Sequence, residues 1–292
     1  MFQIVTDSCC DIPFQFLDEA GIAFIPMLVE INGQEYKDDL GKTFDVDFFY
    51  EALKDKQMPT TSQINVGRYL EFFEPYAQKG IPVIYLSFSS GLSGSYNSAL
   101  QAVAVLKEDY PQAEVAVVDT LAASLGQGLL VLGAKKQQAA GKSFTEVIAW
   151  VEEQKMLLQS WVTVDDLKHL ERGGRISKSE AALGGLLKVK PIIHVDKNGK
   201  LQNVDKVRGR NKSLQKIVDE TLAHLTSRQE QIVYIAYSGD VAAAETVLAA
   251  ITAEVDIEDV ACLPLGPTIS AHTGLGCVAI FTFGKNRNEE VS

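Results

Sequence analysis

The chain has 292 residues, a length that favours two domains over one core. Hydrophobic residues make up 46% of it and charged residues 22%, as in an ordinary globular protein, and no apolar run reaches the roughly 18 residues that span a membrane. The net charge of −11 repels phosphate backbones, so nucleic-acid binding is not expected. It also disfavours anionic lipid surfaces and leaves only transient membrane contact open.

The cysteines and the first residues bear on the compartment. Two of the four cysteines, Cys9 and Cys10, are adjacent, and neither they nor Cys262 and Cys277 form a C-x-x-C motif. We therefore expect reduced thiols and a cytoplasmic protein. The start of the sequence carries no basic region before its apolar residues, so we expect no signal peptide.

The first half of the chain alternates between predicted strands and helices. Short apolar runs indicate strands, whereas amphipathic runs indicate helices. Strands are predicted at 2–6, 22–31, 82–87 and 114–118, helices at 13–20, 45–54, 66–78, 98–106, 123–140 and 144–158, a hairpin turn at 32–33 and a loop at 59–63. This order predicts an α/β fold with a doubly wound, mainly parallel sheet, whose ligands bind beyond the carboxyl ends of the strands.

The second half has a different pattern. Turn residues at 196–199 lie between two strand-like runs and predict an antiparallel hairpin. The remaining expectations are strands at 160–164, 192–195, 201–207, 232–237, 260–263 and 278–283 and helices at 165–170, 211–225 and 241–251. We predict a smaller α+β domain with a mixed sheet, which places an N-terminal domain at 1–158 and a C-terminal domain at 159–288.

The most informative segment is the serine loop, residues 89–97, with the sequence SSGLSGSYN. It lies between a predicted buried strand and a predicted helix. Hydroxyls and backbone N–H groups at a helix N-terminus suit an anionic head group such as a carboxylate or a phosphate. An ordinary capped helix start would need the same residues.

A serine hydrolase is the main competing interpretation of this loop. The order Ser93, then Asp119 or Asp165, then His272 matches the order of a hydrolase triad, and residues 91–95 differ from the G-x-S-x-G motif at one position. The chain lacks an HGGG-type oxyanion segment, and the loop has more serines than one nucleophile requires. An anion cradle accounts for all of these serines.

Two further segments supply candidate head-group donors. Thr60, Thr61 and Ser62 are adjacent hydroxyl residues that either add donors to the same anion or cap the next helix. His272 lies in the glycine-bounded segment 266–276, where it either donates to an anion or serves as scaffold. No pair of cysteine or histidine residues has the spacing of metal ligands, so no metal site is predicted.

Two basic segments are candidate phosphate or partner contacts. Arg175 and Lys178 follow the pair Gly173-Gly174, so they either meet a phosphate or remain solvated beyond a helix C-cap. Lys206, Arg208, Arg210 and Lys212 alternate along a predicted strand end. Period-2 geometry predicts one basic face, which is either a docking surface or a solvated hairpin.

The ordered set of motifs resembles the DegV family. The matching segments are TDS at 6–8, TTSQ at 60–63, SSGLSGSYNSA at 89–99, VVDT at 117–120, LERGGRIS at 170–177 and HTGLG at 272–276. The resemblance implies the two-domain DegV-like (EDD) fold, which is similar to the substrate-binding subunit of dihydroxyacetone kinase. It further implies a long-chain fatty acid bound between the domains, with no other cofactor.

The resemblance also implies specific roles for residues. The carboxylate-binding residues of the family match Thr61, Ser62, Ser93 and Gly94, and a late histidine near the head group matches His272. Several family members are the acyl-binding subunit of bacterial fatty acid kinase. This implies a non-enzymatic protein of phospholipid metabolism that presents the carboxylate to an ATP-binding kinase subunit. A serine esterase and a stand-alone lipid carrier remain as alternatives.

Overall fold

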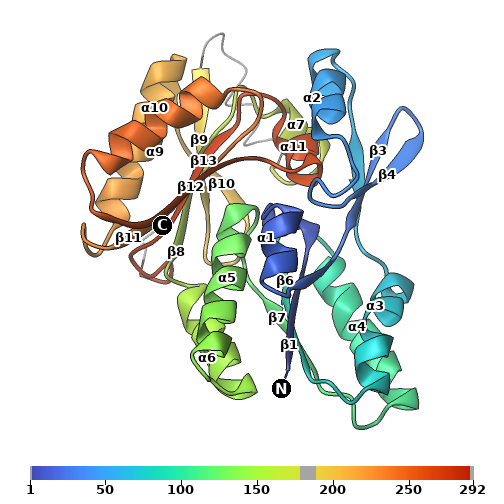
Figure 1. Cartoon of the computed structure of the whole chain (residues 1–292). Coiled ribbons are helices and arrows are strands. Elements are labelled where there is room, and N and C mark those ends of the chain that lie inside the picture. Colours follow the sequence, from blue (N-terminus) through green and yellow to red (C-terminus); the bar gives the residue numbers. More distant parts are fainter. Residues whose placement is uncertain (1, 178–188, 290–292) are drawn as a thin grey trace.

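The computed structural model describes residues 2–177 and 189–289, which form three β-sheets with flanking helices (Figure 1). The first sheet is parallel, in the order β2-β1-β6-β7. Its strands are β1 (Gln3–Asp7), β2 (Ala23–Ile25), β6 (Val83–Ser87) and β7 (Val115–Asp119). All five residues of β6 are buried, as expected for a central strand covered on both faces.

Helices lie on both faces of this sheet, which confirms the doubly wound arrangement (Figure 1). The longer helices of this half are α3 (Val66–Gln78), α4 (Ser95–Asp109), α5 (Leu125–Ala139) and α6 (Phe144–Gln154). The shorter helices of this half are η1 (Ser8–Cys10), α1 (Phe14–Glu19) and α2 (Val46–Lys54). The carboxylate of Asp45 accepts hydrogen bonds from two N–H groups of α2 and so caps the N-terminus of this helix.

A second, antiparallel sheet corrects two expectations. It comprises β3 (Met27–Ile31), β4 (Gln34–Asp38) and β5 (Thr60–Ser62), in the order β4-β3-β5. The extended segment 22–31 is two strands rather than one, because Pro26 cannot donate a ladder hydrogen bond. The predicted loop at 59–63 is wrong, since β5 pairs with β3.

The third sheet has the order β10-β9-β8-β13-β11-β12 and confirms the predicted mixed sheet. Of its described pairs, β11–β12 is parallel and the others are antiparallel. Its strands are β8 (Leu158–Thr163), β9 (Val189–Val195), β10 (Leu201–Arg208), β11 (Gln231–Tyr237), β12 (Ile257–Pro264) and β13 (Val278–Phe283). Helices α9 (Arg210–His224) and α10 (Val241–Thr252) cover one face (Figure 1).

Helix α5 lies between the parallel and the mixed sheets. It contacts β1 and β6 on one side and β8, β11 and β13 on the other. Gly126 permits this approach, because a Cβ atom there would lie 2.9 Å from the ring of Phe281. One buried apolar cluster therefore extends through both halves of the chain and includes Ile4, Leu130 and Phe281.

Two short helices, α7 (Lys168–Arg172) and α11 (Pro267–Thr273), pack against each other. No helix is predicted in the segment 266–276, so α11 is an element that the sequence did not indicate. Proline at the first helical position and a glycine with positive φ after the last one, Gly274 at 70°, are ordinary helix boundaries. Helix α11 also contacts β3 and β5, so a late segment of the chain packs on the second sheet.

Candidate functional site

A cavity lies between the two halves of the chain. Its empty volume is about 820 Å³, including space open to solvent. Most of its wall is apolar, and it is supplied by both halves: Met27, Phe88, Leu92, Ala123, Val162, Val164, Leu170, Ile193, Val195, Leu201, Leu265, Ile269, Ala279 and Phe281. This mostly apolar lining with a few polar side chains is typical of a pocket for an apolar ligand.

Thr61 lies in this wall at the middle of β5, where it pairs with Val29. Side chains alternate along a strand, so Thr61 is half-buried and its neighbour Ser62 is exposed. The helix-capping interpretation of Thr60–Ser62 is wrong, because the cap of α3 is the side chain of Asn65. The structure thus places Thr61 at the cavity and turns Ser62 away from it.

The serine loop contributes Ser93 to the cavity. Its Oγ lies 2.9 Å from Oγ of Ser95, and Ser95 Oγ accepts a hydrogen bond from the N–H of Ile64, just after β5. Gly94 lies against the Gln63 side chain, because a Cβ there would lie 2.1 Å from Oε1 of Gln63 and would displace that side chain. Helix α4 begins at Ser95, three residues earlier than predicted.

His272 lies in the cavity wall on α11, and its Nε2 is 2.7 Å from Oγ1 of Thr61. Burial, and secondarily the charges of Arg175 and Arg172, lower its pKa to about 4, so the ring is neutral at pH 7. Its Nδ1 is buried and has no hydrogen-bond partner among the described residues. We place the proton on Nε2, where the hydroxyl of Thr61 accepts it, rather than on Nδ1, where the N–H would be buried without a partner. Nε2 then donates to Thr61, whose own hydroxyl hydrogen is free for an anion.

The geometry of a serine hydrolase is not present in the described residues. Nε2 of His272 is bonded to Thr61 rather than to Ser93, and Nδ1 has no carboxylate partner. The two candidate acids have other contacts: Asp119 accepts N–H groups from Ser90 and Leu121, and Asp165 pairs with Lys190 at 2.6 Å.

Arg175 is half-buried and also lines the cavity. Its Nε donates to the carbonyl of Leu92 at 2.9 Å, next to Ser93, and a guanidinium nitrogen donates to the carbonyl of Gly173. Gly173 itself lies against His272, because a Cβ there would be 2.2 Å from Nδ1. Thr61, Ser93, His272 and Arg175 are thus brought together, whereas Lys178 lies outside the described residues.

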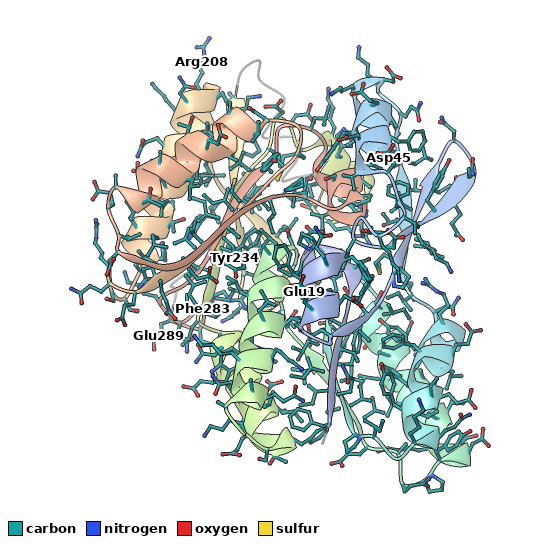
Figure 2. All side chains as sticks on the ribbon, in the orientation of Figure 1. Glu19, Asp45, Arg208, Tyr234, Phe283 and Glu289 are labelled. Atoms are coloured by element: carbon teal, nitrogen blue, oxygen red, sulfur yellow. The ribbon has the colours of Figure 1, made fainter. Side chains whose placement is uncertain are left out.

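The predicted basic face at 206–212 is not one face. Strand β10 ends at Arg208, and α9 begins at Arg210 after Gly209, whose φ is 100°. The change from strand to helix breaks the period of two. Arg208 is exposed at the edge of the molecule, as Figure 2 shows, whereas Arg210 is half-buried and pairs with Asp240 at 3.4 Å.

Two buried carboxylates that the sequence did not indicate hold the start of α11. Asp38 accepts bonds from the N–H and the hydroxyl of Thr268, and Asp11 accepts from the N–H of Gly266 and the hydroxyl of Ser124. Thr268 and Ser124 line the cavity, as do Gln63 and Thr273. Because Thr268 and His272 are one helical turn apart, the second sheet contacts α11 at two points: Asp38 of β4 near its start and Thr61 of β5 near its end.

Burial raises the pKa of Asp38 to about 6, above its ordinary value of 3.8. Between pH 3.8 and about pH 6 the folded protein therefore binds more protons than the unfolded chain. The contribution of Asp38 to the stability of the fold is complete below about pH 4 and is lost as the pH rises through 6. We expect Asp38→Asn to flatten the decline of the free energy of unfolding between pH 4 and pH 7. In the wild-type protein, Asp38 lowers the free energy of unfolding by at most about 1.4 kcal/mol for each pH unit, and the variant removes this contribution. Urea unfolding at each pH measures this slope, and equal slopes in both proteins would contradict the prediction.

Comparison with known proteins identifies the family. The family model described as an uncharacterised protein of the DegV family matches residues 1–285. The chain belongs to the DegV family. A DegV domain-containing protein of Clostridium perfringens is 42% identical to it over 286 residues, with 98% of each chain covered.

Solved DegV structures share the fold. A DegV protein from Thermus thermophilus, described as binding fatty acid, has a TM-score of 0.86 and 29% identity, with 97% of this chain and 99% of that chain covered. A stearic-acid-binding protein from Eubacterium ventriosum has a TM-score of 0.84 and 28% identity, with 98% and 99% covered. The α/β fold of this DegV chain, with its parallel and mixed sheets, is therefore a family property.

Two kinds of feature are absent from the part of this DegV chain that the structure describes. Within 2–177 and 189–289, no helix is long and apolar enough to cross a membrane. In the same ranges, no group of three or more histidine, cysteine or acidic residues is placed to hold a metal ion.

Proposed function

We propose that this protein binds a long-chain fatty acid in the cavity between two lobes, residues 1–158 and 159–288, with the carboxylate at Thr61 and Ser93. The observation that carries the proposal is an apolar cavity with a polar cluster in its wall, where Thr61 is bonded to His272. The two solved DegV structures described as binding fatty acids support it.

The apolar wall accounts for most of the affinity. An acyl tail of about 14 to 16 methylenes gains on the order of 0.8 kcal/mol for each buried CH₂, or roughly 10 kcal/mol before ordering costs. The head group then needs orientation more than binding energy. The hydroxyls of Thr61 and Ser93 donate to the carboxylate, Gly94 leaves room for Gln63 beside them, and Ser62 lies on the outer face of β5.

Native mass spectrometry of the purified protein tests the proposal. We expect a co-purified mass of a long-chain fatty acid that organic solvent extracts. A serine esterase would instead be labelled covalently at Ser93 by a fluorophosphonate. An empty protein that takes up no added stearate, or a labelled Ser93, would refute the proposal.

We further propose that the bound carboxylate is presented to an ATP-binding kinase subunit in the cytoplasm. The free, reduced cysteines suit that compartment. A carboxylate held by hydroxyls keeps more of its nucleophilicity than one clamped by a bidentate arginine. Its oxygen would attack the γ-phosphorus of ATP, with ADP leaving, while the kinase supplies metal and nucleotide. Arg175 lies in the described cavity wall and is the candidate cation for the resulting acyl phosphate.

The exposed Arg208 is the better candidate for a kinase contact, because Arg210 is engaged with Asp240. We expect Arg208→Glu to lower the rate of acyl phosphate formation by the kinase subunit several-fold without changing stearate affinity. Lys107→Glu, an exposed change on α4, is the control. Equal rates for the wild type and both variants would show that Arg208 is a solvated residue and not a kinase contact. If the wild-type protein supported no phosphorylation at all, a stand-alone carrier would be favoured.

A further inference from the structure

The start of the serine loop touches a turn from the other half of the chain. Oγ of Ser89 donates to the carbonyl of Gly199 at 2.7 Å, in the turn between β9 and β10. Ser89 is fully buried, and its Oγ also accepts the N–H of Gly91 at 3.1 Å. A side chain 110 positions away in sequence from its partner thus joins the two halves of the chain.

Two glycines make this contact possible. A Cβ on Gly91 would lie 2.6 Å from the carbonyl oxygen of Asn198, and one on Gly199 would lie 2.1 Å from Oγ of Ser89. Real Cβ atoms do not approach so closely, so both positions need glycine. Gly199 also has a φ of 69°, which other residues rarely adopt. The two segments are therefore packed backbone to backbone.

Ser89 is directly coupled to Ser93. The carbonyl of Ser89 accepts hydrogen bonds from the N–H groups of Leu92 and Ser93, at 3.1 and 3.2 Å. These bonds form one tight turn, so a displacement of Ser89 moves the backbone of Ser93 with it. The turn between β9 and β10, which holds Gly199, is fixed as well, because the buried guanidinium of Arg287 donates to the carbonyls of Val195 and Asp196.

We propose that Ser89 is a positioning residue, which sets the head-group hydroxyl of Ser93 through its bond to the turn at Gly199. The inference rests on the proposed function, because it takes a carboxylate as the group that Ser93 meets. Ser89 is not among the described residues that line the cavity, so a ligand bound there would not contact it. Its loss therefore weakens recognition of the carboxylate and leaves the binding of the tail unchanged.

The test compares two ligands that share a tail, stearate and 1-octadecanol, each displacing the same fluorescent fatty-acid probe. We expect Ser89→Ala to weaken stearate binding roughly five- to tenfold, the effect of about one hydrogen bond, and to change octadecanol binding less than twofold. Ser90→Ala is the matched control, because Ser90 is exposed and adjacent. In a Ser93→Ala background, Ser89→Ala should have no further effect on the ratio of the two affinities.

If Ser89→Ala lowered the affinities for stearate and octadecanol in proportion, Ser89 would only support the fold. If it lowered neither affinity, the turn would not position Ser93. Either result overturns the inference while leaving fatty-acid binding intact. Failure of the wild-type protein to bind stearate would instead overturn the proposed function.

Hydrogen exchange on the wild-type protein gives a second test that needs no variant. Coupling between two sites is reciprocal, so a ligand that orders Ser93 must also order the turn. The N–H of Gly199 donates to the carbonyl of Asp196 within that turn. We expect stearate to slow exchange at Gly199 more than octadecanol does. Equal protection by the two ligands would contradict the coupling.

Discussion

Replacing Thr61 by valine and Ser93 by alanine in the same chain is expected to lower the affinity for stearate about 100-fold or more. Hydrogen bonds to a charged group contribute about 1.5 to 3 kcal/mol each, and each 1.4 kcal/mol is a factor of ten. Valine keeps the shape of threonine, so the change at Thr61 removes the hydroxyl without opening the cavity wall. It also removes the bond to His272, which adds to the loss.

Displacement of a fluorescent fatty-acid probe measures this effect, and Ser62→Ala is its matched control. Ser62 is the next residue of β5 and is exposed, so its hydroxyl should not matter. Stearate affinity that is unchanged in the double variant would place the head group elsewhere in the cavity. A similar loss in Ser62→Ala would indicate a general disturbance of β5 instead.

Replacing Arg287 by alanine is expected to cost roughly 3 to 5 kcal/mol of the free energy of unfolding. Arg287 is 2% exposed, and its guanidinium donates to the carbonyls of Leu121, Val195, Asp196 and Lys155. These carbonyls come from three separate connections of the fold. Truncation leaves them buried without this donor, and buried polar groups without partners are costly.

Urea unfolding measures this cost, with Arg228→Ala as the control. Arg228 pairs with Glu254 at 2.8 Å, but both side chains are 54% exposed, so the loss should be below about 1 kcal/mol. If the two variants lost similar amounts, the interior position of Arg287 would contribute nothing beyond a surface ion pair.

The serine loop shows which features of the site local sequence could predict and which it could not. Its glycines and serines between a strand and a helix predicted an anion cradle, and Ser93 does lie in the cavity wall. The partner of Ser89 could not be predicted, because nothing near residue 199 distinguishes that turn from an ordinary hairpin. Thr61 was singled out as well, but its strand was not, since a three-residue strand leaves no periodic signal.

The sequence alone indicated most strands and helices, the parallel and mixed sheets, the hairpins and the motifs of the family, because these depend on residues close together in the chain. It did not indicate the β4-β3-β5 sheet or helix α11. Tertiary structure decided which side chains meet. Thr61 and His272 are 211 positions apart, Asp38 and Thr268 are 230 apart, and Arg287 and Asp196 are 91 apart. Such contacts follow from how distant segments of the chain pack together, and no local pattern of hydrophobicity or charge encodes them.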